Sequence, residues 1–307
     1  MESDLITWLR RRLPPHPLLR LGPGDDAAVL RMADMAECAV TVDLLSDGVD
    51  FQLDQIDPRR AGRKALAVNL SDLAAIAARP LAGVVSVCLP RSGGFDLAKA
   101  LVEGMLPLAE KYDVAIAGGD TNSWEGPLVI SVTLLGAVTG RGPLRRDGAR
   151  LGDRILVTGA LGGSLLGRHL DFEPRVREAL LLNERYRLHA GIDVSDGLSV
   201  DLAHLAEASG CGAVLHTTSV PIHDDARRLA RDRADGPTPL ERALNDGEDF
   251  ELILAVRPSV AETLLAEQPL DVPLTDVGEF VAEPGLWQVD VRGARRELVP
   301  RGWEHPL

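Results

Sequence analysis

The sequence has few aromatic residues, few cysteines and no long apolar run, and each shortage excludes a class of protein. Aromatic residues make up 4% of the 307 residues, which favours an aliphatic α/β core over a β-sandwich or an aromatic stacking surface. Cys38, Cys88 and Cys211 form no C-x-x-C pair, so we expect neither a zinc site nor a disulfide framework. Their spacing fits a reducing environment, and we expect the protein to be cytoplasmic.

An excess of positive charge and a membrane-spanning segment are missing as well. The formal net charge is −13, whereas binding to a nucleic-acid backbone needs a basic face, so we expect no nucleic-acid partner. No stretch approaches the roughly 20 apolar residues of a membrane span. Residues 1–12 carry charges throughout, unlike a signal peptide. We therefore expect no membrane partner.

The order of the apolar segments predicts an α/β (α+β) fold with two domains. Strands are expected at 38–45, 83–89 and 128–138, with helices at 59–78 and 96–112. A further strand, 114–117, is expected to end at Gly118. The Gly- and Arg-rich stretch 139–152 is expected to join domain 1–140 to domain 141–307. In the second half, strand 154–158 is expected to lead through a glycine turn into a helix that begins at Leu161.

What the sequence does contain is a set of motifs that place a carboxylate beside a glycine or a hydroxyl group. They are Gly24-Asp25-Asp26, Asn69-Leu70-Ser71-Asp72, Gly118-Gly119-Asp120-Thr121 and Asp193-Val194-Ser195-Asp196-Gly197. Converging carboxylates repel one another and lose hydration, so they need a compensating cation. Mg²⁺ prefers oxygen ligands and is often shared between a few carboxylates and a substrate phosphate. The motifs therefore favour a metal-dependent phosphoryl-transfer enzyme.

The motif that ends at Asp72 is informative because it lies on an otherwise apolar helix. Between residues 65 and 78 the only polar residues are Asn69, Ser71 and Asp72. Asn69 and Asp72 are three residues apart and therefore share one face of the helix. Since a buried carboxylate without a partner is unfavourable, Asp72 is expected in a salt bridge, in a helix-capping bond or in a metal site. We favour the metal site.

The other motifs each have an ordinary structural alternative. Asp43 ends a strand, where it could face a ligand or simply form a turn. Gly118 and Gly119 could let the backbone approach a phosphate, or could form a plain hairpin turn. Two aspartates three residues apart, Asp193 and Asp196, could hold one ion across a turn, although a helix N-cap would explain one of them.

Together, these motifs resemble those of the thiamine-monophosphate kinase family, in the superfamily that also contains aminoimidazole ribonucleotide synthetase and selenophosphate synthetase. The segments that carry the resemblance occur in family order along almost the whole chain, at 24–29, 64–75, 118–121, 193–198 and 247–252. The resemblance implies a fold like that of aminoimidazole ribonucleotide synthetase, with an N-terminal domain that dimerises through its sheet and a C-terminal α/β domain. It also implies ATP and several Mg²⁺ ions in the cleft, and Mg-assisted in-line phosphorylation of thiamine monophosphate to thiamine diphosphate.

The resemblance also implies roles for individual residues, position by position. The implied metal ligands are Asp26, Thr41, Asp43, Asp72, Asp120, Asp193 and Asp196, with Val42 contributing only its backbone carbonyl. The implied ATP contacts are Tyr112, Gly119, Asp120, Arg146 and Ser195. The implied substrate contacts are Asp50, Glu248 and Trp303. No residue is assigned as a general base.

Among the positions that depart from the family pattern, two leave other functions open. Asp50 stands where the family usually has a histidine, and Asp246 stands where it usually has a glycine. A carboxylate at position 50 would repel an acceptor phosphate unless a cation intervened. One alternative is therefore a related ATP-dependent kinase or synthetase with a different acceptor, and another is a degenerate nucleotide-binding dimer without turnover.

Overall fold

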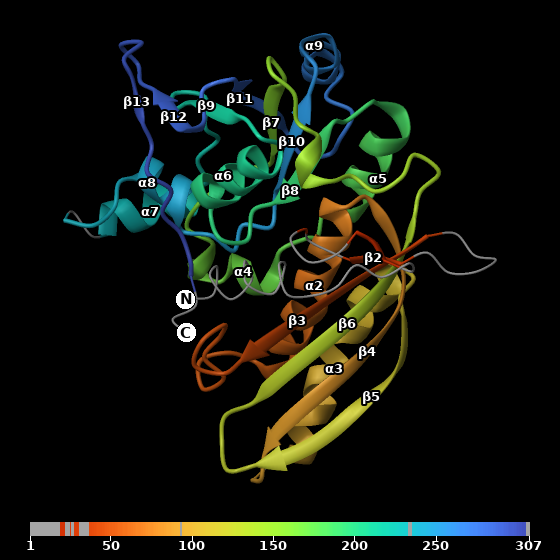
Figure 1. Ribbon diagram of the computed structural model, residues 1–307. Coiled ribbons are helices and arrows are strands. Elements are labelled where there is room, and N and C mark those ends of the chain that lie inside the picture. The colour runs from red at the N-terminus through yellow and green to blue at the C-terminus, as the bar shows by residue number, and fades with distance from the viewer. Residues whose placement is uncertain are drawn as a thin grey trace.

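The computed structural model describes residues 19–21, 25, 28–30, 37–92, 94–232 and 235–304. Figure 1 shows two sheets with their helices, the N-terminal one below and the C-terminal one above. The last strand of the first sheet ends at Val138 and the first strand of the second sheet begins at Arg154. Residues 139–153 therefore connect the two sheets.

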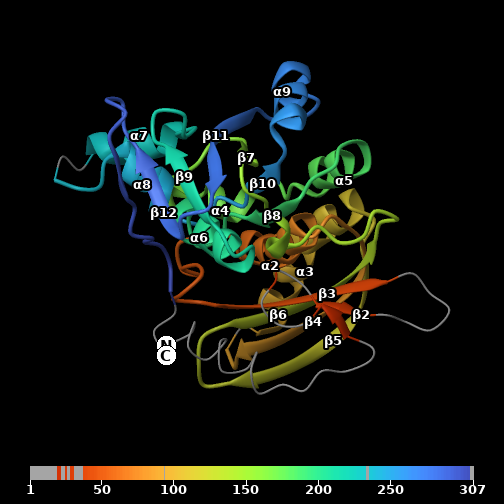
Figure 2. The ribbon, with the colours of Figure 1, turned by 45° about the horizontal axis from the view of Figure 1, so that its top comes forward.

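The N-terminal sheet is mixed and has helices on one face. Its strands run in the order β1-β2-β3-β6-β4-β5, and every neighbouring pair is antiparallel except β4 and β5. Helices α2 and α3 pack against one face (Figure 2). The bounds are β1 (Leu19–Leu21), β2 (Ala28–Leu30), β3 (Cys38–Ser46), α2 (Pro58–Ala75), β4 (Ala78–Pro90), α3 (Gly94–Lys111), β5 (Ala115–Trp124) and β6 (Val129–Val138).

The second sheet is mostly antiparallel. Its order is β13-β12-β9-β11-β7-β10-β8, and only β9 and β12 run parallel. Its elements are η1 (Arg146–Gly148), β7 (Arg154–Thr158), η2 (Ser164–Leu166), α4 (Arg168–Asp171), α5 (Val176–Arg185), β8 (Ala190–Asp193), α6 (Leu198–Ala208), β9 (Gly212–His216), α7 (Asp224–Asp232), α8 (Pro239–Asn245), β10 (Leu252–Val256), α9 (Pro258–Glu267), β11 (Leu274–Val281), β12 (Gly285–Val289) and β13 (Arg295–Glu297).

Helix α2 is the element on which both domains pack. It begins where the Asp57 carboxylate accepts a hydrogen bond from the backbone of Arg59 at 2.9 Å, with Pro58 in the first turn. Gly62 lets α3 approach closely, because a Cβ atom there would lie 2.1 Å from the carbonyl oxygen of Leu101. On its other sides α2 contacts β3, α5 and β8. This position explains why nearly all of its side chains are buried.

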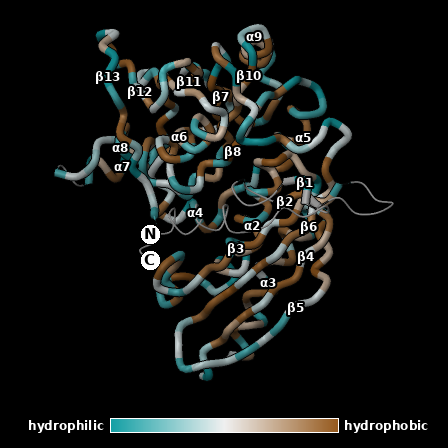
Figure 3. Tube along the Cα trace, in the orientation of Figure 1, coloured by the Kyte–Doolittle hydropathy of each residue, from teal (hydrophilic) through white to brown (hydrophobic). Residues whose placement is uncertain are grey.

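One apolar core crosses the domain boundary. It joins residues of α2, α3 and the first sheet to residues of α5, β10 and α9 in the second half. The hydrophobic segments in Figure 3 run through these central elements. A second core lies between α6 and the C-terminal sheet. Within the part of the chain that the structure describes, none of the helices combines the length and the apolar character that crossing a bilayer requires.

Two expected elements differ from the structure. The strand expected at 114–117 continues to Trp124 as β5, because its backbone pairs in parallel with β4 over that whole length. The helix expected from Leu161 is replaced by the short η2 and α4. Gly162 and Gly163 have φ values of +87° and +76°, which a right-handed helix does not contain.

Candidate active site

Strand β3 and helix α2 bring together the first group of candidate metal ligands. Thr41 and Asp43 are two residues apart on β3, so both side chains lie on the face of the sheet that α2 covers. The Thr41 hydroxyl donates a hydrogen bond to the carboxylate of Asp72, in the last turns of α2. Asp72, for which a salt bridge, a helix-capping bond and the favoured metal site are the alternatives, thus makes a tertiary contact with β3.

Asn69, one turn earlier on α2, adds a buried oxygen to this group. Its side chain is fully buried, and its Nδ2 donates to the carbonyl oxygen of Ala65 at 3.0 Å. Its Oδ1 accepts no hydrogen bond from any residue that the structure describes. Such an oxygen is unfavourable unless something binds it, and it shares a helix face with Asp72.

The second domain contributes Asp193 to the same region. Asp193 ends strand β8 and is 2% exposed. Its carboxylate accepts a hydrogen bond from the Ser71 hydroxyl on α2. This contact joins the two domains and places Asp193 next to the helix that carries Asp72. Ser71 lies inside one of the sequence motifs, but the motif predicts no separate role for it.

Asp201, which the sequence reasoning missed, lies beneath the segment that follows Asp193. Its carboxylate accepts hydrogen bonds from the backbone N–H groups of Asp196 and Gly197, at 3.1 and 3.0 Å. These bonds hold the turn that leads into α6, whose N-cap position is occupied by Gly197 and not by Asp196. Burial, together with the negative charges of Asp196 and Asp193, raises the pKa of Asp201 well above its usual value. The region around Asp193, Asp196 and Asp201 therefore carries an excess of negative charge.

Three distant segments meet at Ser195 and Asp196. The N–H of Glu248 donates to the carbonyl oxygen of Ser195 at 2.7 Å, and the N–H of Trp303 donates to that of Asp196 at 3.0 Å. Two of the three implied substrate contacts, Glu248 and Trp303, thereby lie beside an implied ATP contact and an implied metal ligand. The Trp303 residue is 49% exposed, so its ring can still be covered by a ligand.

Asp50 does not direct its carboxylate outward. Its Oδ2 accepts a hydrogen bond from the backbone N–H of Ser46 at 2.6 Å, within the turn that follows β3. Its carbonyl oxygen accepts a hydrogen bond from the Lys64 ammonium group at 2.8 Å. A positive charge, the Lys64 ammonium group of α2, thus lies at the backbone of Asp50.

Arg146 brings a positive charge to this acidic region. Its guanidinium Nε lies 3.8 Å from Oδ1 of Asp25, and its backbone N–H donates to Asp25 at 3.2 Å. The charge of Arg146 also acts to lower the pKa of Asp201, and η1, which begins at Arg146, packs against α6. Asp26, the implied metal ligand next in sequence, lies outside the described residues.

Gly119 and Asp120 are not brought to this group within one chain. Asp120 on β5 is aligned across the sheet with Ser86, Ser131 and Leu44, so its side chain lies on the outward face. Asp43 faces the opposite side, toward α2. Three strand spacings, about 14 Å, separate β5 from β3. The roles of Gly119 and Asp120 in metal and ATP binding stay predictions.

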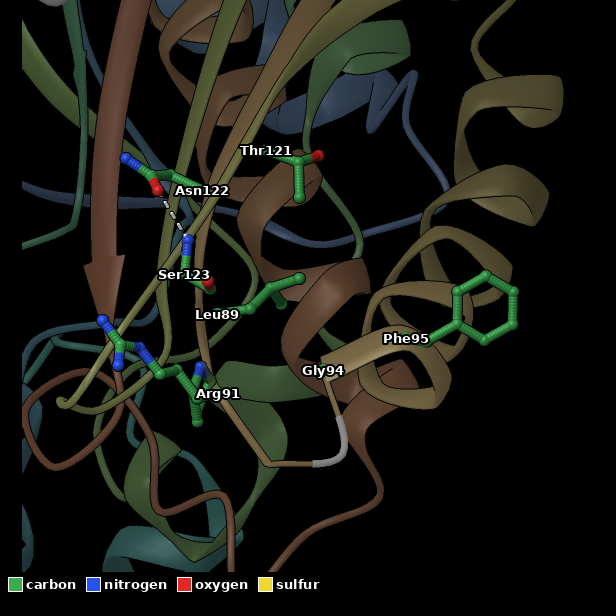
Figure 4. Close-up of a pocket in the computed structure, with 8 residues that line it drawn as sticks. Leu89, Arg91, Gly94, Phe95, Thr121, Asn122 and Ser123 are labelled. Atoms are coloured by element: carbon green, nitrogen blue, oxygen red, sulfur yellow. Dashed lines mark hydrogen bonds between the residues drawn. The ribbon is translucent and has the colours of Figure 1, made fainter.

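A cavity of about 310 Å³ adjoins this motif at the end of β5. Figure 4 shows Thr121 and Asn122 on the strand side, with Phe95 at the start of α3 opposite. The sequence motif therefore borders a hollow of its own, away from Thr41 and Asp72.

Tyr112 is buried, whereas the side chain of Val42 is exposed. Tyr112 is 8% exposed, and its hydroxyl group donates to Glu173 and contacts the carbonyl oxygen of Pro174 at 2.8 Å. Because it is buried in this contact between α3 and the second domain, we remove it from the ATP contacts. The Val42 side chain is 60% exposed on the outward face, so only its backbone could act as a ligand.

Comparison with known proteins places this geometry in a family of ATP-binding α/β proteins. Residues 24–138 match the AIR synthase related protein N-terminal domain, and residues 154–287 match the AIR synthase related protein C-terminal domain. A thiamine-monophosphate kinase of Rhodopirellula baltica is 42% identical over 313 aligned residues, covering 99% of this chain and 97% of the relative. The chain belongs to the thiamine-monophosphate kinase family.

Solved structures agree with that assignment. AaThiL complexed with AMPPCP and TMP superposes with a TM-score of 0.82 at 26% identity, covering 99% of this chain and 96% of that one. A thiamine-monophosphate kinase from Stenotrophomonas maltophilia K279a superposes with a TM-score of 0.73 at 35% identity, covering 93% and 94%. The family resemblance and the fold class expected from the sequence are therefore confirmed.

Asp249, beside Glu248, leads to a prediction about pH and stability. Its carboxylate is 2% exposed and accepts hydrogen bonds from the N–H of Gly162 and from Arg168, all within 3.0 Å. Burial raises the pKa of Asp249 from 3.8 to about 7, against the lowering effect of Arg168. Between about pH 4 and pH 7 the folded protein therefore holds a proton that the unfolded chain has lost.

This contribution to stability is fully present at low pH and is lost as the pH rises through about 7. The slope attributable to Asp249 is at most about 1.4 kcal/mol per pH unit. We expect the free energy of unfolding, measured by denaturant titration across this range, to fall less steeply with pH in Asp249→Asn than in the wild type. Equal slopes in the two proteins would contradict the assignment.

Proposed function

We propose that this protein transfers the γ-phosphoryl group of ATP to the phosphate of thiamine monophosphate, forming thiamine diphosphate and ADP. One observation carries the proposal. Helix α2 links Thr41 through Asp72, and Asp193 through Ser71, so that oxygen ligands from both domains converge. This convergence occurs in a chain that is 42% identical, end to end, to a thiamine-monophosphate kinase.

The residues in this region fit Mg²⁺. The donor set is made of carboxylate and hydroxyl oxygens, with the buried Oδ1 of Asn69 beside them, and oxygen is the ligand that Mg²⁺ prefers. Burial, and after it the repulsion from Asp196 and Asp193, raises the pKa of Asp201, and a cation relieves such an excess of negative charge. Thr41, Asp43, Asp72, Asp193 and Asp196 would hold the ions, together with Asp26. When bound, Mg²⁺ supplies charge neutralisation and alignment of the phosphates.

The chain's own residues hold the two substrates and need not move a proton. Arg146 supplies a positive charge near Ser195 and Asp196, which suits the polyphosphate. Glu248 and Trp303 border the acceptor side through their bonds to the same segment. A phosphate monoester is largely ionised near neutral pH, since its second pKa is about 6. The attacking oxygen thus needs no strong general base, and none is assigned.

The outward face of the N-terminal sheet fits a homodimer. Apolar side chains stand exposed on it, at Val42, Leu44, Val84 and Leu135, and no described helix covers them. Such a patch is typical of an interface between protein chains. Beyond Val40, strand β3 has only β6 as a neighbour among the described strands, which leaves that edge open to a second copy.

Dimerisation would also give Asp120 a role. Its side chain lies on the outward face, which the partner's sheet would cover, and on the edge strand that is three strands away from its own Asp43. In a two-fold dimer, each sheet presents the same surface to the other. We propose that Gly119 and Asp120 of one protomer complete the ATP and metal site of the partner. The cytoplasmic location expected from the cysteines remains a prediction.

The identity of the acceptor is tested by a panel. Purified protein with ATP and Mg²⁺ is offered thiamine monophosphate, thiamine or AMP, and products are separated by chromatography. We expect thiamine diphosphate from the first acceptor only, and none after chelation of the metal, with recovery when excess Mg²⁺ is restored. Turnover of another acceptor instead would favour the related-kinase alternative raised by Asp50. ATP binding without any product would favour the degenerate dimer.

A further inference from the structure

Lys64 is a lysine whose ammonium group is buried inside the protein. The residue is 1% exposed and lies on the face of α2 that packs against other elements, with Ala61 and Ala65 also fully buried. Lysine is almost never fully buried unless its charge is paired. Removing an ammonium ion from water costs several kcal/mol after relaxation. The ammonium group therefore needs partners, and the identity of those partners indicates its role.

Both residues that the Lys64 ammonium contacts, Asp50 and Glu248, are implied contacts of the acceptor substrate. It donates to the Glu248 carboxylate and, at 2.8 Å, to the carbonyl oxygen of Asp50. Glu248 belongs to the second domain and Asp50 to the first, so the ammonium group fixes the two sides relative to each other. The bond to Asp50 uses the backbone and is therefore independent of which side chain occupies position 50.

The backbone of Glu248 is fixed separately from its side chain. Its φ is +51°, in the left-handed region that few residues other than glycine adopt. The N–H bond to Ser195 holds this conformation on one side, and the Asp249 carboxylate bound to Gly162 holds it on the other. The remaining freedom of Glu248 lies in its side chain, which is 26% exposed and ends on Lys64.

We propose that Lys64 is a positioning residue for the acceptor: it holds the Glu248 carboxylate in the orientation that contacts thiamine monophosphate. This inference rests on the proposed function. It assigns Lys64 to the acceptor and not to ATP, because both of its contacts lie at residues placed on the acceptor side. A purely structural ion pair would instead affect stability and both substrates alike.

The test is a double-mutant cycle with Lys64→Met and Glu248→Gln, measured as KM for thiamine monophosphate, KM for ATP, kcat and thermal midpoint. A hydrogen-bonded charge of this kind is worth about ten- to a hundredfold in binding. We expect each single variant to raise KM for thiamine monophosphate by at least about tenfold and to change KM for ATP by less than about twofold. We expect the double variant to be no worse than the worse single one, since both remove the same interaction.

Two further variants keep the result interpretable. Lys99→Met changes an exposed lysine on α3 and should leave both KM values unchanged. If Lys64→Met does not fold, Lys64→Arg takes its place in the cycle, because it keeps the charge and changes its geometry. Lys64 variants that raise both KM values equally, that lower only the thermal midpoint, or whose effect multiplies with that of Glu248→Gln overturn the inference and leave the proposed function intact. A folded wild type that neither binds nor converts thiamine monophosphate overturns the proposed function, and this inference with it.

Discussion

Replacing Asp72 by asparagine is expected to lower kcat for thiamine diphosphate formation about a thousandfold, a loss of about 4 kcal/mol of transition-state stabilisation. Asparagine keeps the shape of the side chain and can still accept the hydrogen bond from Thr41. It removes the negative charge that Asp72 contributes where ligands from both domains meet. Steady-state kinetics at several Mg²⁺ concentrations measures the effect, and circular dichroism on heating checks that the fold persists.

Asp54→Asn is the matched control for that experiment. Asp54 is exposed on the loop that precedes α2, and its replacement makes the same change in total charge. We expect its kcat to stay within about twofold of the wild type, as for most exposed positions. Turnover that survives in Asp72→Asn at limiting Mg²⁺ would remove Asp72 from the metal site.

Asp120→Asn and Asp72→Asn, each nearly inactive alone, are expected to recover about a quarter of wild-type activity when mixed and allowed to exchange subunits. Asp120 lies on the outward face of β5, away from Asp43 and Asp72 of its own chain. If it serves the partner's site, a mixed dimer carries one site with both defects and one intact site. Random exchange makes about half of the dimers mixed, which gives the quarter.

The control mixture pairs Asp72→Asn with Asp193→Asn. These residues lie in the same site of one chain, joined through α2 and Ser71, so no arrangement of subunits restores an intact site. Light scattering on the same samples gives the oligomeric state. A monomer, or a mixture of Asp120→Asn and Asp72→Asn that stays inactive despite proven exchange, would contradict the proposed contribution across the dimer.

The part of the site on α2 could be predicted because local sequence carries it. A helix with only Asn69, Ser71 and Asp72 among apolar residues needs partners for them. In the structure, Asp72 pairs with Thr41 and Ser71 pairs with Asp193. The strand and helix that bear Thr41 and Asp72 were predicted to within a few residues. Here the apolar pattern predicts a buried helix, and the few polar side chains on it predict a site.

Residues whose role depends on distant contacts were missed. Asp201 resembles an ordinary acidic residue in the first turn of a helix, where the helix dipole alone would favour it. Lys64 had a visible signal, since it lies between Ala61 and Val68 on the buried stripe of α2. Its partner Glu248 is 184 residues away, and no local pattern indicates that pairing.

The segments with consecutive glycines were the least predictable. Gly118 and Gly119 suggested a loop, yet pairing with β4 keeps them in strand β5. Gly162 and Gly163 suggested the start of a helix, yet their backbone N–H groups bind Asp249 and Asp246 instead. Because glycine permits several backbone conformations, tertiary hydrogen bonds determine the conformation of both glycine pairs.

The most direct test of the central claim is ³¹P NMR of purified protein with ATP, Mg²⁺ and thiamine monophosphate. We predict that the two phosphorus signals of thiamine diphosphate grow in step with those of ADP, and that neither grows when thiamine monophosphate is omitted. ATP consumed to ADP and free phosphate, with thiamine monophosphate unchanged, would contradict transfer to that acceptor.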